Sequence, residues 1–194
     1  MKIARNARAA LLAVALCSAA AAQAAVLSFA GDATARSSGF LDPTCAPQLY
    51  RSSVSAANSS GTSSLGNFTY ASSACQTPGG LASGIFAISF GSDGFAGTFN
   101  GFTSTTDTAF VFTPHFTYDI LSGTGRFLGA SGVFLGTGLF DSRNPPPTLN
   151  FHFDGFVDAP AVPEPATWAM MLIGFAATGF AMRRRTTVTK LQLA

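Results

Sequence analysis

Two histidines are the side chains of this sequence best suited to acid–base chemistry or metal ligation, and each stands close to an aspartate. His115 is followed by Asp119, and His152 is followed by Asp154. A histidine and a carboxylate can exchange a proton with a substrate or ligate a metal ion together. Each histidine falls on the polar phase of an amphipathic strand, however, where such a spacing arises readily by chance. We therefore expect no catalytic residue, no metal and no other cofactor, and keep His115 and His152 as candidate ligand contacts.

A third candidate is Arg126, the only charged residue in the glycine-rich stretch 122–132. We expect its guanidinium to hydrogen-bond backbone carbonyls at the end of a β structure, with contact to a ligand as the alternative. The catalytic motifs H-E-x-x-H and G-x-S-x-G are absent from the sequence, as is a phosphate-binding glycine loop. These features favour a protein that is not an enzyme.

Cys45 and Cys75 are the two cysteines that remain once the N-terminal segment is set aside. In an oxidising compartment an even pair favours one disulfide, with two separate thiols as the alternative. Closing a loop of about 31 residues would stabilise the fold by ~3.5 kcal/mol in the chain-entropy model.

The segment that carries these residues has the composition of an all-β domain. Residues 25–161 contain no Lys, Glu, Met or Trp, but hold 17 of the 19 phenylalanines and 18 of the 20 glycines. Apolar residues alternate with small or polar ones along several short stretches, as at Phe86, Ile88 and Phe90. We expect a single antiparallel barrel of about eight strands or a β-sandwich.

The alternation places candidate strands at residues 26–30, 49–53, 67–72, 84–90, 97–103, 109–113, 116–121, 127–128, 132–140 and 149–156. Pro114 lies between two of these and predicts a turn or bulge there. The stretch 52–64 is rich in Ser, Ala and Asn and predicts a mobile surface loop.

The charge of this domain excludes one class of partner. Between residues 26 and 162 stand four arginines and eight aspartates, a net charge of −4, although the whole chain carries +2. The excess of basic residues therefore lies in the terminal segments. A mildly acidic domain without a basic patch is not expected to bind nucleic acid.

The N-terminal segment has the pattern of a secretory signal peptide. Lys2, Arg5 and Arg8 precede an apolar run at residues 9–16, and Ala22 and Ala24 place small side chains three and one positions before the predicted cut. We expect residues 1–24 to direct export through the Sec machinery and then to be removed.

The C-terminal segment predicts a membrane helix. Seventeen uncharged residues, 166–182, cover about 25 Å as a helix, near the lower limit for crossing a bilayer core. Arg183, Arg184 and Arg185 follow, which keeps residues 186–194 in the cytoplasm as a tail. Pro163 and Pro165 keep the preceding segment extended and therefore open to a processing enzyme.

This order of Pro163-Glu164-Pro165, short apolar helix and arginine cluster resembles the PEP-CTERM sorting signal of Gram-negative bacteria, over residues 162–185. The resemblance implies recognition of Pro163, Glu164 and Pro165 by an exosortase, a membrane protease. It also implies cleavage near these residues and transfer from the inner membrane to the cell surface or an exopolysaccharide matrix. The alternative is a permanent single-pass anchor.

A second resemblance concerns the barrel. Gly97-Thr98-Phe99-Asn100-Gly101 and the stretch 122–132 resemble the strand and turn of allene oxide cyclase and dirigent-like β-barrels. The resemblance implies that Gly123 and Gly125 permit positive φ and that Phe127 plugs the barrel. We interpret the protein as a non-enzymatic surface or matrix protein. The alternatives are a barrel that binds a small apolar ligand and a cyclase-like or isomerase-like enzyme.

Overall fold

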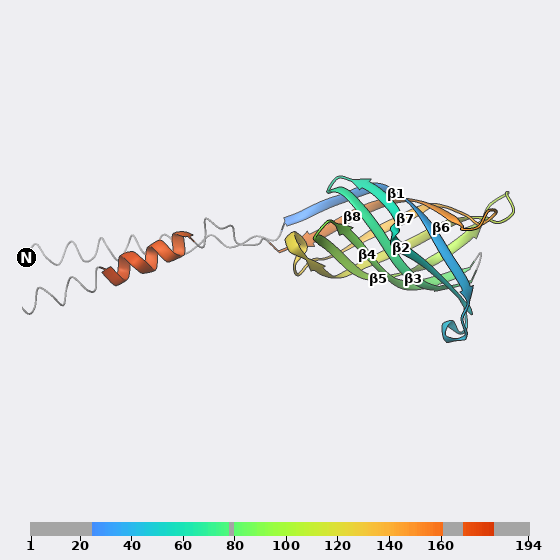
Figure 1. The fold of residues 1–194 in the computed structure, drawn as a ribbon, viewed down its shortest axis with the longest axis horizontal. Coiled ribbons are helices and arrows are strands. Elements are labelled where there is room, and N and C mark those ends of the chain that lie inside the picture. Colours follow the sequence, from blue (N-terminus) through green and yellow to red (C-terminus); the bar gives the residue numbers. More distant parts are fainter. Residues whose placement is uncertain (1–24, 78–79, 161–168, 181–194) are drawn as a thin grey trace, which may run out of the picture. The chain divides into compact units, whose positions relative to one another are not determined.

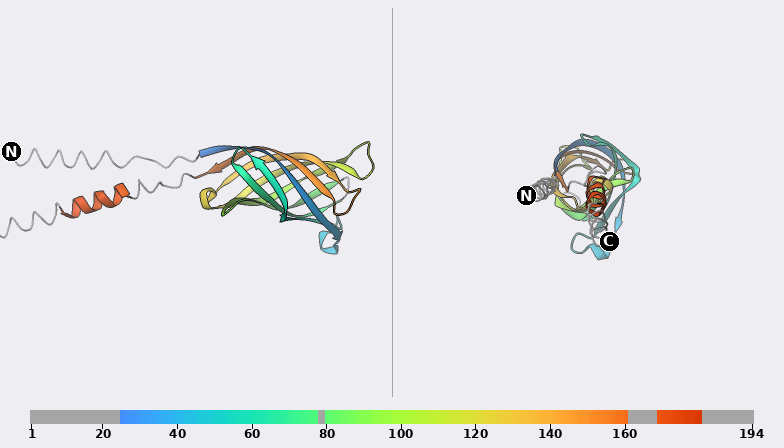
Figure 2. Two further views of the ribbon diagram at one scale, coloured as in Figure 1. Left: turned by 45° about the horizontal axis from the view of Figure 1, so that its top comes forward. Right: turned by 90° about the vertical axis from the view of Figure 1, so that its left-hand side faces the viewer.

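Eight antiparallel strands form a closed barrel in the computed structural model, which describes residues 25–77, 80–160 and 169–180. Each strand pairs with the next along the chain, and the last pairs back with the first (Figures 1 and 2). The strands are β1 (Ala25–Leu41), β2 (Tyr50–Ser63), β3 (Gly66–Gln76), β4 (Leu81–Phe90), β5 (Asp93–Thr105), β6 (Val111–Thr124), β7 (Ser131–Asp141) and β8 (Thr148–Ala159). The predicted all-β barrel is confirmed, and the sandwich alternative is wrong.

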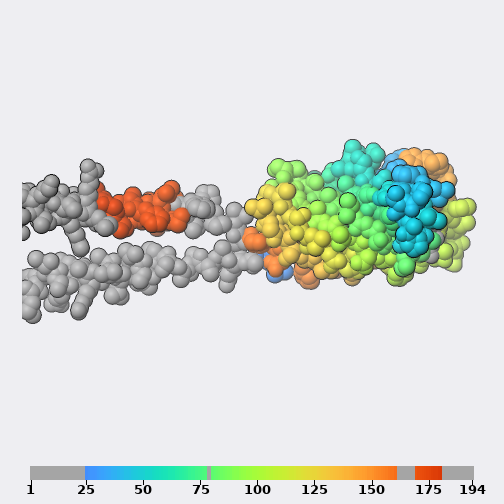
Figure 3. Space-filling view, turned by 90° about the horizontal axis from the view of Figure 1, so that it is seen from below, coloured from blue at the N-terminus to red at the C-terminus, as the bar shows by residue number. Residues whose placement is uncertain are grey.

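Two short 3₁₀ turns lie at opposite ends of the barrel. The turn η1 (Pro43–Cys45) lies in the loop between β1 and β2, and η2 (Gly125–Phe127) lies between β6 and β7. Figure 1 shows η2 at the end where β1 begins and β8 finishes. We call this the terminal end, and the opposite end, which carries the η1 loop, the loop end. In Figure 3 the blue atoms that include the η1 loop lie near the right-hand end of the barrel, on the face toward the viewer.

The predicted alternation is the physical basis of the barrel, because inward positions are aromatic or aliphatic and outward positions are mostly small or polar. Phe86 and Ile88, two of the residues that show the predicted alternation, are 4% exposed or less, as are Tyr118 and Phe153 on other strands. Phe110, which falls in the strand predicted at 109–113, instead lies in the loop before β6 with a φ of 63° and is 67% exposed. Hydrophobic burial of one face of every strand therefore stabilises the closed sheet.

Several predicted strand limits are wrong. The strands predicted at 109–113 and 116–121 form one strand, β6, and the stretch 127–128 ends η2 and begins a turn instead of forming a strand. The predicted loop at 52–64 belongs almost entirely to β2, and β1 continues to Leu41, well past residue 30. Eight long strands thus replace ten short ones.

Pro114 lies inside β6, not at a turn, and its side chain is almost fully buried. Pairing between β6 and β5 runs straight through Pro114, which lies opposite Thr103. Pairing between β6 and β7 skips Thr113 and Pro114 and resumes at His115. Because proline lacks an N–H, the strand tolerates it where one ladder is already interrupted.

The serine-rich part of β2 contains a wide bulge. Residues 55–58 lie opposite Arg36 alone, because Ala35 pairs with Ser59 while Ser37 pairs with Val54. The Ser59 hydroxyl accepts from the Tyr70 backbone N–H at 2.8 Å and lies 2.7 Å from the Tyr70 carbonyl oxygen. This side chain replaces ladder bonds that the bulge removes, which explains how a stretch without hydrophobic alternation remains in the sheet.

The C-terminal helix is described over residues 169–180 and belongs to a unit separate from the barrel. The predicted span at 166–182 extends past both limits of this described helix. None of the helical residues that the structure describes forms a helix with the length and hydropathy of a membrane span.

Candidate functional site

His115 lies on the outer wall of the barrel, in the middle of β6. Its Nε2 atom is 3.3 Å from the Ser104 hydroxyl, and its ring stacks on Phe102 with 5.0 Å between centroids. No contact between His115 and Asp119 is found among the described residues. These neighbours give His115 a structural environment on the surface and no acid–base partner.

His152 also lies on the outer wall, on β8, where it pairs across the sheet with Asp32 of β1. Its Nδ1 atom donates to the Asp32 carboxylate at 2.9 Å, and both side chains are mostly exposed. Thr137 lies between the two histidines in the ladder, so they occupy one row but do not meet. In the described ranges, no three His, Cys, Asp or Glu side chains gather in a way that would hold a metal ion.

Arg126 is held at the terminal end by several groups. Its guanidinium donates to the Leu65 carbonyl oxygen at 2.7 Å and lies 3.6 Å from the Asp93 carboxylate. It also lies over the rings of Phe127 and Phe90, 4.7 and 5.3 Å from their centroids. The expected hydrogen bond to a backbone carbonyl is therefore present, and the guanidinium closes over the aromatic core.

The turn beneath Arg126 explains two of its glycines. Gly125 has a φ of 59°, as the sequence predicts, and a Cβ there would lie 1.9 Å from a carboxylate oxygen of Asp93. Gly123 is not in the positive-φ region, so that part of the prediction is wrong. A Cβ at Gly123 would instead lie 1.9 Å from the Phe127 carbonyl oxygen, so glycine is needed there for close approach. Phe127 is fully buried, as expected for a plug.

Aromatic rings fill the interior of the barrel. Tyr118 and Phe134 stack at 4.6 Å between centroids, and Phe29, Phe86 and Phe153 pack edge-on against this pair. Such centroid distances are those of directly packed rings. Side chains of Phe29, Phe86, Tyr118, Phe134 and Phe153 thus pack directly on one another inside the barrel.

The polar groups in this interior satisfy one another. The hydroxyls of Tyr70 and Tyr118 are 3.2 Å apart, and burial raises the pKa of Tyr70 and raises that of Tyr118 well above its usual range. Both phenols are therefore neutral at physiological pH, and neither serves as a ready proton acceptor.

The Cys45–Cys75 disulfide is present, as the sequence predicts, with 5.2 Å between the Cα atoms. It joins η1 to the end of β3, and Arg51 supports the same loop by donating to Asp42 at 2.5 Å. Hydrogen bonds from Arg51 and then from Thr44 lower the pKa of Asp42 to about 2. The η1 loop is thus cross-linked covalently and electrostatically to the wall.

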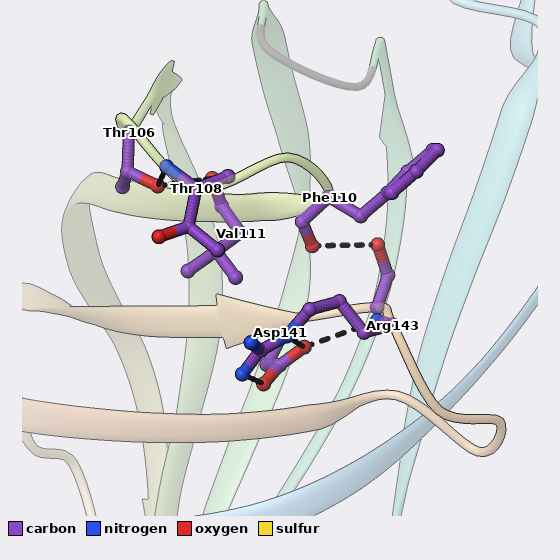
Figure 4. A network of polar contacts seen from close by, with 7 residues as sticks. Thr106, Thr108, Phe110, Val111, Asp141 and Arg143 are labelled. Atoms are coloured by element: carbon purple, nitrogen blue, oxygen red, sulfur yellow. Dashed lines mark hydrogen bonds and ion pairs between the residues drawn. The ribbon is translucent and has the colours of Figure 1, made fainter.

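A second polar network joins the β5–β6 and β7–β8 loops of the loop end (Figure 4). The Ser142 hydroxyl donates to the Phe110 carbonyl oxygen at 2.9 Å, and Thr106 donates to Val111 at 2.9 Å. The Arg143 side chain donates two hydrogen bonds to Asp141, at 3.0 and 2.6 Å, and its backbone N–H donates a third at 3.0 Å. The side-chain bonds and then the backbone bond lower the pKa of Asp141 to about 2. Figure 4 shows the Phe110 ring projecting away from this network.

The sequence prediction misses a groove on the outer wall around Arg36. Two hollows of about 320 and 590 Å³ share Arg36 and Asn58, so they adjoin. We define the Arg36 groove by the polar residues that line these hollows: Thr34, Arg36, Ser37, Ser38, Ser53, Ser55, Asn58, Ser59, Ser60, Thr148 and Asn150. They come from β1, from β2 and its bulge, and from β8, which lies far from the other two in the sequence. No local sequence pattern distinguishes Arg36 from the other arginines of the barrel.

The comparisons with known proteins concern the C-terminal segment. Residues 161–185 match the PEP-CTERM protein-sorting motif. The chain carries a PEP-CTERM sorting motif. This motif implies processing by an exosortase and export to the cell envelope or surface. No curated protein and no solved structure matches the chain, so the resemblance to allene oxide cyclase and dirigent-like barrels gains no support from relatives.

Several predicted sites lie outside the described residues. These are the signal-peptide residues Ala22 and Ala24, the motif residues Pro163, Glu164 and Pro165, and the cluster Arg183, Arg184 and Arg185. The PEP-CTERM motif is therefore identified by its sequence match.

Proposed function

We propose that the protein is a non-enzymatic component of the cell surface or of an exopolysaccharide matrix. The single observation that carries this proposal is the PEP-CTERM motif at residues 161–185. In this proposal the Sec machinery exports the chain, residues 1–24 are removed, and the segment 166–182 holds the protein in the inner membrane for a time. An exosortase then cleaves near Pro163-Glu164-Pro165 and releases the barrel.

The barrel itself supports a non-catalytic role. Its interior is filled with packed rings, and His115 and His152 lie on the outer wall with partners of their own. At the terminal end, the Arg126 guanidinium hydrogen-bonds a backbone carbonyl, pairs with a carboxylate and lies over two aromatic rings. These contacts favour a stably folded, non-catalytic surface domain over a carrier of a small apolar ligand or a cyclase-like enzyme. Specific displacement of a hydrophobic dye by small apolar compounds would contradict this preference.

The experiment that tests sorting measures the intact mass and the cell fraction of the protein in the native host, with and without its exosortase. We expect a product ending near residues 163–165 in the surface or extracellular fraction, and its loss in the strain that lacks the exosortase. A variant with alanine at Pro163, Glu164 and Pro165 should accumulate uncleaved.

The matched control is Pro160→Ala, which changes a proline just outside the motif and should be processed normally. Retention of the full C-terminus in the inner membrane of both strains would contradict the proposal. The segment 166–182 would then be a permanent anchor.

A further inference from the structure

Arg36 differs from the other arginines of the barrel in having no protein partner. Arg51, Arg126 and Arg143 each contact an aspartate, at 2.5, 3.6 and 2.6 Å. Within residues 25–77 and 80–160, Arg36 makes no hydrogen bond or ion pair through its side chain, which is exposed. A guanidinium carries five N–H donors in a planar fork, so this side chain presents a full set of donors to the groove.

The fold holds this arginine in a defined place. Its backbone pairs with Thr148 of β8, while on the β2 side it alone faces the bulge 55–58. Ser59 fixes the bulge to Tyr70, and Ser37 donates its backbone N–H to Pro147 at 2.9 Å. The bulge opens the wall on one side of Arg36, and the β7–β8 connection borders it at Pro146. Bulges commonly redirect side chains in this way beside binding sites.

The lining of the groove determines what it can bind. Apart from Arg36, its polar side chains are hydroxyls and amides, and no acidic or aromatic residue lines either hollow. The hydroxyl pairs Ser38–Ser53 and Thr34–Ser60, at 2.9 and 3.4 Å, continue the polar surface on both sides of Arg36. A ligand that fits this lining carries many hydroxyl groups, which can hydrogen-bond the Ser, Thr and Asn side chains, and an anionic group, which can bind the Arg36 guanidinium.

We propose that the Arg36 groove binds an acidic polysaccharide, with a sugar carboxylate on the Arg36 guanidinium and sugar hydroxyls on the surrounding Ser, Thr and Asn side chains. Arginine recognises a carboxylate with two parallel hydrogen bonds. A peptide is a poorer fit, because every strand of the closed barrel already has two neighbours and the groove lacks large apolar pockets. This inference rests on the proposed surface role and names the matrix component that the protein would contact.

The net negative charge of the barrel means that a polyanion would bind only at a local site. A domain of −4 repels polyanions in general, so binding to one must come from a local site. Binding through a single exposed charge should weaken as salt increases, because the Debye length falls from about 10 Å at 0.1 M to about 3 Å at 1 M.

The test measures binding of the protein, purified from the exported fraction, to polygalacturonate by calorimetry at low and high salt. We expect binding to polygalacturonate and none to dextran, a neutral polysaccharide. Arg36→Gln should weaken binding by at least about tenfold, the size expected for loss of a hydrogen bond to a charged group. Arg143→Gln is the matched control, because it removes the same charge from an exposed arginine of the loop end and should change affinity less than about twofold.

A second variant, Asn58→Asp, places a carboxylate beside Arg36 and should also abolish most binding, while the thermal unfolding of each variant reports that the barrel is intact. Equal losses in the Arg36 and Arg143 variants would overturn the proposal, as would absence of binding to polygalacturonate. Equal binding of poly-glutamate or dextran would overturn the assignment to an acidic saccharide. Sorting is measured separately by cell fraction, so a surface protein that binds no polyuronate would contradict this inference and leave the proposed function standing.

Discussion

Arg126 and Arg36 show how differently the two ends of the barrel use the same residue type. At the terminal end, Arg126 donates to the Leu65 carbonyl oxygen and lies over Phe127 and Phe90. Toward the loop end, Arg36 projects from a bulged wall and has no partner among the described residues. The first guanidinium completes the core, and the second is left available to a ligand.

A charged residue in a conspicuous sequence motif is therefore not always the one that is available to a ligand. Arg126 stands out because it is the only charge among glycines, but its contacts are those of a structural residue. Arg36 stands in an ordinary serine-rich setting, and only the three-dimensional arrangement gives it a groove. Three predictions test this contrast.

The largest effect is expected at the plug beneath Arg126. Phe127→Ala should lower the free energy of unfolding by about 3–5 kcal/mol, because it leaves a cavity where a fully buried ring packs on Phe90 and Phe95. Phe102→Ala is the control, since that ring is 49% exposed on the outer wall and its loss should cost less than about 1 kcal/mol. Urea denaturation of both variants measures the difference. Similar losses in the two would show that the terminal end is not tightly packed.

An intermediate effect is expected from the two arginines themselves. Arg126→Met should destabilise the barrel by about 1–2 kcal/mol through loss of a charge-assisted hydrogen bond and of the contacts with two rings. Arg36→Met should change stability by no more than about 0.5 kcal/mol, as for a surface side chain without partners. Thermal unfolding of the two variants in parallel makes the comparison. A larger loss of stability in the Arg36 variant would contradict the structural role of Arg126.

The smallest effect concerns the ion pairs of the loop end. The folded-state pKa values of Asp42 and Asp141 are both about 2, below the ordinary value of 3.8. Their contribution to stability is therefore complete above about pH 4 and is lost as the pH falls toward 2. The double variant Asp42→Asn, Asp141→Asn should show a shallower fall in melting temperature between pH 4 and pH 2 than the unchanged protein.

The control for this pH effect is Asp107→Asn, which alters a loop-end carboxylate that has no arginine partner in the part of the chain that the structure describes. Its pH profile should match that of the unchanged protein. Profiles that are the same in all three proteins would show that these pairs do not stabilise the loop end.

The barrel was predictable because its strands follow a simple physical rule. Residues such as Phe86, Tyr118 and Phe153 alternate with small or polar neighbours, and alternation requires an apolar and a polar face. The disulfide was predictable from the even cysteine count. The bulged part of β2 was not, because a serine-rich stretch has no such alternation and stays in the sheet through Ser59, a contact made with another strand.

The position of Pro114 inside a strand and the Arg36 groove were not predicted, for related reasons. Whether a strand tolerates an internal proline depends on whether the hydrogen-bond ladder to a neighbouring strand is interrupted at that residue. For Pro114 this is decided by how β7 pairs with β6. The groove depends on residues from β1, β2 and β8 meeting at one bulge. The sorting motif, by contrast, is contiguous in sequence and needed no fold to be found.

The pairing of Ala25 with Ala159 determines where the barrel is attached to the rest of the chain. The first residue of β1 and the last residue of β8 lie at the terminal end, while Thr148 at the start of β8 pairs with Arg36. The 12 residues of β8 separate these points by about 40 Å at ~3.3 Å per residue. An attachment made through Ala159 would therefore hold the barrel at the end remote from the Arg36 groove.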